Sequence, residues 1–105
     1  MKYETIKNIS IVVIGYNEEN NLINTFEAIK NINYDKNKLE IIYVDSGSTD
    51  NSLEIAKNYT DKVFIEKGEW KSAAKNRNRG IREASHNILH FIDGDISIHP
   101  DYLKK

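Results

Sequence analysis

The sequence alternates short apolar runs with segments of helical periodicity, and this alternation restricts the folds that the chain can adopt. Residues 9–14 are almost continuously apolar and rich in β-branched side chains, which is typical of a strand buried on both faces of a parallel sheet. Further strands are predicted at residues 39–44, 62–66 and 87–92. The first run therefore predicts a central strand of a parallel sheet.

Helices are predicted between these strands. Leu22, Phe26 and Ile29 recur at helical spacing and indicate a helix of about three turns. Two more are expected, one with a stripe of Leu53, Ala56 and Tyr59 and one at residues 72–84. The order βαβαβαβ predicts a Rossmann-like α/β fold, in which right-handed crossovers place helices on both faces of the sheet.

Composition narrows the class of protein. The 105 residues are enough for one domain, and a net charge of -1 gives no field that would attract nucleic acid. There are no cysteines, which excludes a disulfide framework and a thiolate zinc site. No apolar run approaches the ~20 residues of a transmembrane helix, and the first residues lack the apolar stretch of a signal peptide. We therefore expect a cytoplasmic protein without a transmembrane segment or a nucleic-acid partner.

Polar residues beside a glycine follow three of the predicted strands, at residues 15–18, 45–48 and 93–95. In an open parallel sheet, ligands bind at the carboxyl ends of the strands. A glycine at such an end permits unusual backbone angles or the close approach of a ligand. The sequence therefore predicts that these three segments converge on one binding crevice.

The triplet Asp93-Gly94-Asp95 is the sharpest of these signals. By itself, Asp-Gly is among the commonest turn dipeptides, and a solvated turn would be the default interpretation. At the end of a buried strand, however, carboxylates two residues apart can point the same way and share one hard divalent cation. The position favours a site at which Asp93 and Asp95 hold Mn²⁺ or Mg²⁺ against a diphosphate.

The segment before the last strand is basic. Arg79 and Arg82 are expected on a solvated helix face. Arg77 shares a helix face, which we predict to be the buried side, with Ala73, Ala74, Gly80, Ile81 and Ala84. An arginine there would need an acidic or phosphate partner, so a role beside the ligand and a structural role are both open for Arg77.

Two further side chains have alternative roles. Tyr16 can stack on a nucleobase or pack under its loop, and its position at a strand end favours stacking. Asp45 can accept hydrogen bonds from a base or ribose, or can cap the following helix, for which Ser48, Thr49 and Asp50 are further cap candidates. These alternatives stay open at the level of sequence.

Four segments resemble the family 2 glycosyltransferases of the GT-A fold. They are residues 11–19, the second-strand signature 44–50, the arginine-asparagine segment 77–81, and 91–95, which is similar to the family's metal-binding DxD motif. Each motif alone is weak, but their common order and spacing make the resemblance specific. It covers residues 9–103 and implies that residues 1–105 form a GT-A-type half domain.

The resemblance also implies the ligand and the residues that bind it. It implies a nucleoside-diphosphate sugar as donor, with Tyr16, Glu18 and Asp45 lining the nucleoside pocket. Asp93 would lie near the ribose and diphosphate, Asp95 would coordinate Mn²⁺ or Mg²⁺, and Arg77 would lie near the diphosphate. The acceptor, whether glycan, lipid or protein, is left open.

Two departures from the family pattern matter. Many members have a second aspartate where this chain has Ser46, and that aspartate can read the uracil edge, so the base identity stays open. The acceptor half and the catalytic base of inverting members follow the DxD motif, whereas this sequence ends at Lys105. We therefore expect a donor-binding part that does not complete transfer alone, with its exposed sheet edge open to self-association.

Three other functions would make use of parts of the same sequence pattern. A non-catalytic nucleotide-binding or interaction module could use the same residues. A sugar nucleotidyltransferase would need a glycine-rich basic loop after the first strand, whereas residues 15–19 carry acids and no lysine or arginine. A flavodoxin-like receiver domain would need an acidic pair after the first strand and a later lysine, and the match is poor.

Overall fold

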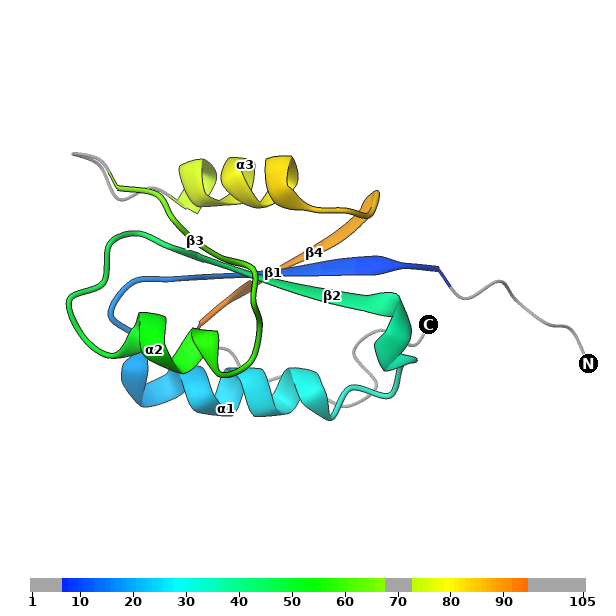
Figure 1. Ribbon diagram of the computed structural model, residues 1–105, viewed down its shortest axis with the longest axis horizontal. Helices are drawn as coiled ribbons and strands as arrows, with labels where there is room; N and C mark the ends of the chain where they lie inside the picture. The colour runs from blue at the N-terminus through cyan, green and yellow to red at the C-terminus, as the bar shows by residue number, and fades with distance from the viewer. Residues whose placement is uncertain (1–6, 68–72, 95–105) are drawn as a thin grey trace, which may run out of the picture.

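The computed structural model describes residues 7–67 and 73–94 (Figure 1). Within them, parallel strands and helices alternate along the chain. In order, the elements are β1 (Ile9–Gly15), α1 (Glu19–Lys30), the short 3-10 turn η1 (Lys36–Lys38), β2 (Leu39–Asp45), α2 (Ser52–Lys57), β3 (Val63–Ile65), α3 (Ala73–Glu83) and β4 (Ile88–Asp93). The predicted βαβαβαβ order is confirmed.

The strands form one parallel sheet with the order β3-β2-β1-β4. Helices α1 and α2 cover one face, and α3 lies on the other (Figure 1). The chain passes from β3 through α3 to the far side of β1, where β4 pairs with it. This is the predicted Rossmann-like arrangement, with helices on both faces.

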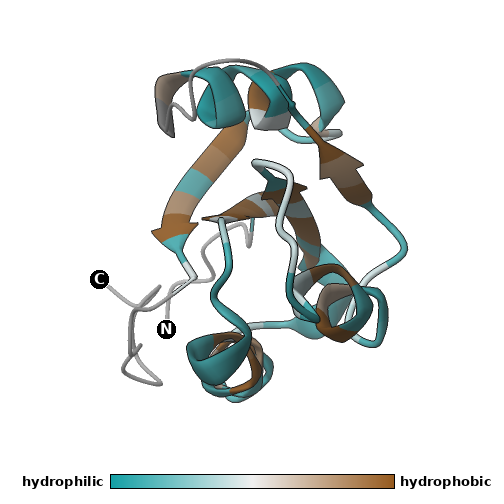
Figure 2. Cartoon of the chain, turned by 90° about the vertical axis from the view of Figure 1, so that its left-hand side faces the viewer, coloured by the Kyte–Doolittle hydropathy of each residue, from teal (hydrophilic) through white to brown (hydrophobic). Residues whose placement is uncertain are grey.

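The apolar strand residues pack on both sides of the sheet. Every residue of β1 except Gly15 is buried, as its continuous apolar pattern predicts. On one face, Phe26 of α1 packs against Tyr43 of β2. On the other, Val12 and Ile14 lie beneath α3, and the brown strands between the helices in Figure 2 mark this apolar layer. The core therefore fixes β1 and β2, whose carboxyl ends carry the candidate site.

Some predicted element boundaries differ. Helix α2 ends at Lys57, so Tyr59 lies beyond it, yet the Tyr59 ring still stacks on Phe26 with centroids 4.8 Å apart. Strand β3 contains only three residues. Across the described ranges, no helix is long and apolar enough to cross a membrane.

Candidate functional site

The carboxyl ends of the strands lie side by side. Asp93 of β4 is in register with Ile14 of β1, and the Gly94 amide donates to the Ile14 carbonyl at 2.9 Å. On the other side of β1, Gly15 is in register with Asp45 of β2. The described parts of the three polar segments predicted to converge therefore meet at one edge of the sheet.

The strand order reverses at this edge. From β1 the chain moves through β2 to β3 on one side, and β4 pairs with β1 on the other. In open α/β sheets, such a switch point opens a crevice between the loops that leave the two strands. Here these loops begin at Tyr16 and at Gly94, so the chain topology itself selects this position.

The loop after β1 is tied to the loop after β2. Asn17 has a left-handed backbone with φ of 52°, and its amide donates to Ser48 Oγ at 2.8 Å. Its side-chain oxygen accepts from the Thr49 amide at 2.8 Å. Beside it, the Tyr16 side chain is exposed. The hydrogen bonds hold the backbone around Tyr16 while its ring faces outward, as stacking on a base would require.

Acidic residues reinforce the same junction. Glu18 precedes α1; its amide donates to Ser52 Oγ at 2.9 Å, and its carboxylate accepts from Asn21 at 3.1 Å. Asp50 accepts from the amides of Glu19 and Ser52, at 3.2 and 2.9 Å. Burial alone would raise the pKa of Asp50, but these hydrogen bonds hold it below the ordinary value. Glu18 thus lies at the crevice, while Asp50 joins α1 to α2.

Asp45 is completely buried, and both of its oxygens are directed to the protein. Oδ1 accepts from the Tyr43 hydroxyl at 2.7 Å and from Ser48 Oγ at 2.6 Å. Oδ2 accepts from the Gly47 and Ser48 amides at 2.8 and 2.5 Å. Asp45 therefore closes the loop after β2. It does not cap α2, whose N-cap residue is Asn51, so the capping alternative is wrong.

Tyr43 supports this arrangement from beneath. Burial, together with the hydrogen bond to Asp45, raises the pKa of the Tyr43 phenol far above its ordinary value. The hydroxyl thus stays protonated and remains a donor to Asp45. Gly15 must be small here because a Cβ atom would lie 2.9 Å from the Tyr43 hydroxyl oxygen.

Ser46 is nearly buried beside the end of β1. Its amide donates to the Gly15 carbonyl at 3.1 Å, and its hydroxyl accepts from Asn76 Nδ2 at 2.6 Å. No motif in the sequence singles out Asn76. The available signal was an amide within a helix that had to pack on an apolar sheet, where a buried polar group needs a partner.

The predicted buried face of α3 is only partly confirmed. Gly80 is buried and Ala84 packs on the core as expected, but Arg77, Ala74 and Ile81 are exposed, and Asn76 faces the sheet instead. The reason is the close approach of the helix at Gly80, where a Cβ atom would lie 2.5 Å from a methyl group of Val12. Since Arg77 faces outward, burial does not oblige it to have an acidic or phosphate partner.

The expected solvation of Arg79 is also wrong. Its guanidinium contacts the Glu66 carboxylate at 2.6 Å and that of Glu83 at 2.9 Å, and it lies over the Phe64 ring. The hydrogen bond from Arg79 lowers the pKa of Glu66. Arg82 is exposed as expected, with one longer contact to Glu66 at 3.3 Å. These contacts fix α3 against β3.

Asp93 is the last residue of β4 and is exposed at the switch point. The next residue, Gly94, is buried, and its carbonyl accepts from Thr25 Oγ1 at 2.8 Å. Asp95 lies outside the described residues. The described part of the chain contains no cluster of three metal-ligating side chains. A cation held by one or two carboxylates and a diphosphate does not need one, so an outward carboxylate at Asp93 fits Mn²⁺ or Mg²⁺.

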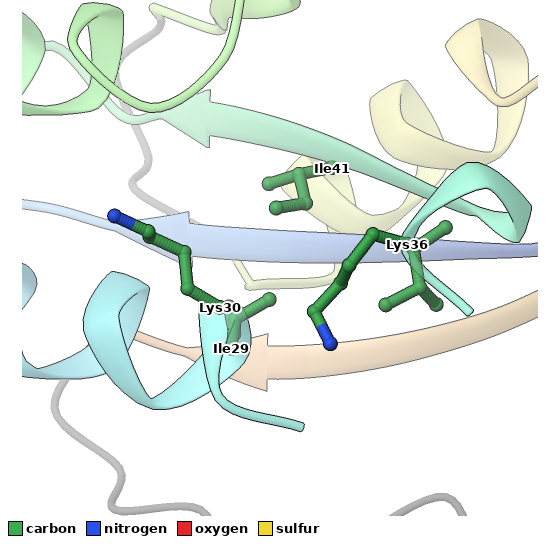
Figure 3. A pocket seen from close by; sticks show the side chains of 5 residues that line it. Ile29, Lys30, Lys36 and Ile41 are labelled. Atoms are coloured by element: carbon green, nitrogen blue, oxygen red, sulfur yellow. The ribbon is translucent and has the colours of Figure 1, made fainter. Parts of the chain in front are cut away.

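A separate apolar hollow lies at the other end of the sheet. It is lined by the end of α1 and the start of β2, with Ile29, Lys30, Lys36 and Ile41 labelled in Figure 3. The Lys36 ammonium donates to the carbonyls of Ile32 and Tyr34. This hollow is remote from the carboxyl ends of β1, β2 and β4 and shares none of the predicted site residues.

Known proteins with a similar sequence and fold are glycosyltransferases. The glycosyltransferase AglE of Haloferax volcanii is 35% identical over 106 residues, covering 96% of this chain and 34% of AglE. TarS of S. aureus in complex with UDP-GlcNAc superimposes with a TM-score of 0.78 at 27% identity, covering 92% of this chain and 29% of TarS. This chain thus spans about a third of the length of the relatives that it matches.

A third relative carries a metal. Glucosyl-3-phosphoglycerate synthase from Mycobacterium tuberculosis, in complex with Mn²⁺, UDP and glucosyl-3-phosphoglycerate, has a TM-score of 0.74 at 25% identity; 92% of this chain and 37% of that one are covered. Residues 10–105 match the family described as Glycosyl transferase family 2. This match and the 35% identity with AglE show that this chain belongs to glycosyltransferase family 2.

Proposed function

We propose that this chain is the donor-binding part of a metal-assisted, inverting glycosyltransferase. The observation that carries the proposal is the exposed Asp93 at the β1–β4 switch point, beside the loop that presents Tyr16. The donor would be a nucleoside-diphosphate sugar; TarS, which has the same fold, is found in complex with UDP-GlcNAc. The nucleoside would lie over Tyr16, Glu18 and Ser46, and the diphosphate near Asp93 and Arg77.

The metal would be held by Asp93 and Asp95. A bound Mn²⁺ or Mg²⁺ supplies charge neutralisation at the departing nucleoside diphosphate. The protein's own contribution is positional: the β4 register fixes Asp93, and the hydrogen bond from Thr25 to Gly94 fixes the backbone that follows. Asp45 would support the nucleoside pocket indirectly, through the loop that its carboxylate closes.

Titration calorimetry tests the site. We would titrate UDP, GDP and their sugars with and without Mn²⁺, first into the unaltered chain and then into Asp95→Ala. We expect metal-dependent binding that falls at least tenfold in Asp95→Ala. The matched control is Asp61→Ala, which removes one carboxylate from an exposed position between α2 and β3. Binding that ignores the metal and survives Asp95→Ala would refute the metal site.

A non-catalytic binding module is the alternative. Deprotonation of an acceptor hydroxyl needs a positioned base, and we assign none of the described residues to that task. A transfer assay separates the two functions, and we expect the 105-residue chain to bind donor with little or no transfer. Efficient transfer by this chain would show that it already holds the base.

The sheet also offers a route to self-association. Among the described strands, β3 pairs only with β2 and β4 pairs only with β1, so each has one unpaired edge. Such an edge can pair with a second copy of the chain. Sedimentation velocity over a range of concentrations tests this, and a monomer at every concentration would rule it out.

A further inference from the structure

A buried contact joins α3 to the end of β2 behind the candidate site. Asn76 is only 3% exposed, and its Nδ2 donates to Ser46 Oγ at 2.6 Å across 30 residues of sequence. Ser46 is 8% exposed, and its amide is bonded to Gly15, the residue before Tyr16. This bond places Ser46 beside the end of β1, next to the loop that carries Tyr16.

The other half of the Asn76 amide is unsatisfied. Its Oδ1 is buried and accepts no hydrogen bond from any residue in the described ranges. An unpaired buried acceptor destabilises a fold, and native structures contain few of them. An alanine at this helix position would avoid both the orphan oxygen and the lower helix propensity of asparagine. An asparagine here is thus costly for folding, which points to a function for its amide.

The direction of the hydrogen bond fixes the chemistry of Ser46. A serine hydroxyl has one hydrogen to donate. Since Asn76 Nδ2 donates to Oγ, that hydrogen remains available to another acceptor. The adjacent Asp45 carboxylate already accepts four hydrogen bonds from Tyr43, Gly47 and Ser48. Ser46 is thus held as a donor, whereas an ionised aspartate at this position could only accept.

We propose that Asn76 is a positioning residue that holds the Ser46 hydroxyl as a hydrogen-bond donor to the nucleobase and so determines which base the site accepts. The proposal rests on the proposed donor-binding function. Uracil and cytosine have the same ring but opposite hydrogen-bond polarity at ring position 3 and at the substituent on position 4. Guanine and adenine are opposite at the corresponding atoms of their Watson–Crick edges. Within each pair, the preferred nucleotide therefore depends on whether the Ser46 hydroxyl donates or accepts a hydrogen bond.

The test exchanges the amide for a carboxylate. In Asn76→Asp at pH 8, the introduced carboxylate would accept a hydrogen bond from the Ser46 hydroxyl. The Ser46 oxygen could then only accept a hydrogen bond from a ligand. We would measure Kd for UDP, CDP, GDP and ADP with Mn²⁺, and for ribose 5-diphosphate, which has no base. The unaltered chain shows which of the two pairs, UDP and CDP or GDP and ADP, the site binds. For that pair we expect the ratio of the two affinities to change by about tenfold in Asn76→Asp, while ribose 5-diphosphate binds as before.

A purely structural role for Asn76 predicts a different pattern. If the amide only docks α3 on the sheet, Asn76→Asp would weaken every ligand by a similar factor and leave the ratios unchanged. Ser46→Ala provides a second variant: without the hydroxyl, the preference within each pair should fall toward one. Asn24→Asp adds the same charge at an exposed position of α1 and should leave all ratios unaltered.

The outcomes separate this inference from the proposed function. If none of the four nucleotides binds the unaltered chain, the donor-binding function is refuted together with the inference. If nucleotides bind, but both Asn76→Asp and Ser46→Ala keep the ratios within twofold, donor binding stands and the role of Asn76 is refuted. A tenfold change in Asn76→Asp, absent in Asn24→Asp, supports it.

Discussion

Replacement of Gly80 by alanine tests how closely α3 must approach the sheet. Gly80 is buried, and a Cβ atom there would lie 2.5 Å from Val12 Cγ1 and 3.1 Å from Val12 Cγ2. Both distances are shorter than an ordinary contact of about 3.5–4.0 Å. Val12 is completely buried, and its own Cβ would lie 3.3 Å from the added carbon, so a change of its rotamer does not relieve the contact. The added methyl must therefore displace α3.

Two opposing effects set the magnitude. Alanine is better than glycine in a helix interior by about 1 kcal/mol. Overpacking a tight core costs about 1–3 kcal/mol, and the short Cβ–Val12 distances place Gly80→Ala near the upper end. The net destabilisation should be about 2 kcal/mol, which for a chain of this size lowers Tm by roughly 10 °C. Asn76, one helical turn before Gly80, should also move away from Ser46.

Thermal unfolding of Gly80→Ala, Val12→Ala and the double variant measures the effect. Val12→Ala removes both methyl groups that the new Cβ would meet, so the double variant should be more stable than the sum of the single effects by about 1–2 kcal/mol. Nucleotide affinity should fall in Gly80→Ala and recover in part in the double variant. A Gly80→Ala chain as stable as the original would refute this account of the helix position.

Three further substitutions probe the contacts that hold the strand ends and their supports. Glu40→Gln should cost about 2 kcal/mol at pH 7. Burial raises the pKa of Glu40, but its hydrogen bonds, led by the one from Lys62, lower it from 4.5 to about 2. Solvent screening makes the stabilisation smaller than this pKa shift alone would give. The pKa of Glu40 is lower in the folded than in the unfolded chain, so the wild type should lose this stabilisation as the pH falls from 4.5 toward 2. The free energy of unfolding of Glu40→Gln, measured in urea titrations, should not show this loss. Thr25→Val should cost about 1–2 kcal/mol in the same assay by leaving the buried Gly94 carbonyl unpaired; no loss would show that another group satisfies it. Gly47→Ala should cost about 1 kcal/mol because φ is +95°, and unchanged stability would mean that the loop adopts another conformation.

Much of the fold could be predicted because it depends on periodicity within short segments. The run that became β1 is apolar at nearly every position, and α1 carries Leu22, Phe26 and Ile29 at helical spacing. Both patterns reflect burial by the nearest elements. For α3 the periodicity placed Gly80 and Ala84 correctly but not Ile81 or Asn76, because the rotation of the helix is set by its close approach at Gly80, which a scale of side-chain hydrophobicity does not register.

The candidate site could be located but not resolved in detail. Strand ends and a topological switch point follow from the order of the elements, so the meeting of Asp93 with the β1 loop was predictable. The hydrogen bonds of Asn17 to the loop after β2 span more than 30 residues, and the bond from Asn76 to Ser46 spans 30. Pairs of this kind arise only when the sheet register brings distant polar groups together.

The structure also divides the acidic residues of the family-like segments into two groups. Asp45 and Asp50 are engaged by backbone amides and hydroxyls of their own loops, and they hold the frame of the crevice. Asp93 is exposed at the strand end, where a cation or diphosphate can reach it. The Asp45 carboxylate already accepts four hydrogen bonds and has little capacity left for a ligand, whereas an exposed carboxylate such as that of Asp93 can still bind one. Substitution of Asp45 should thus lower stability and binding together, whereas substitution of Asp93 should lower metal-dependent binding alone.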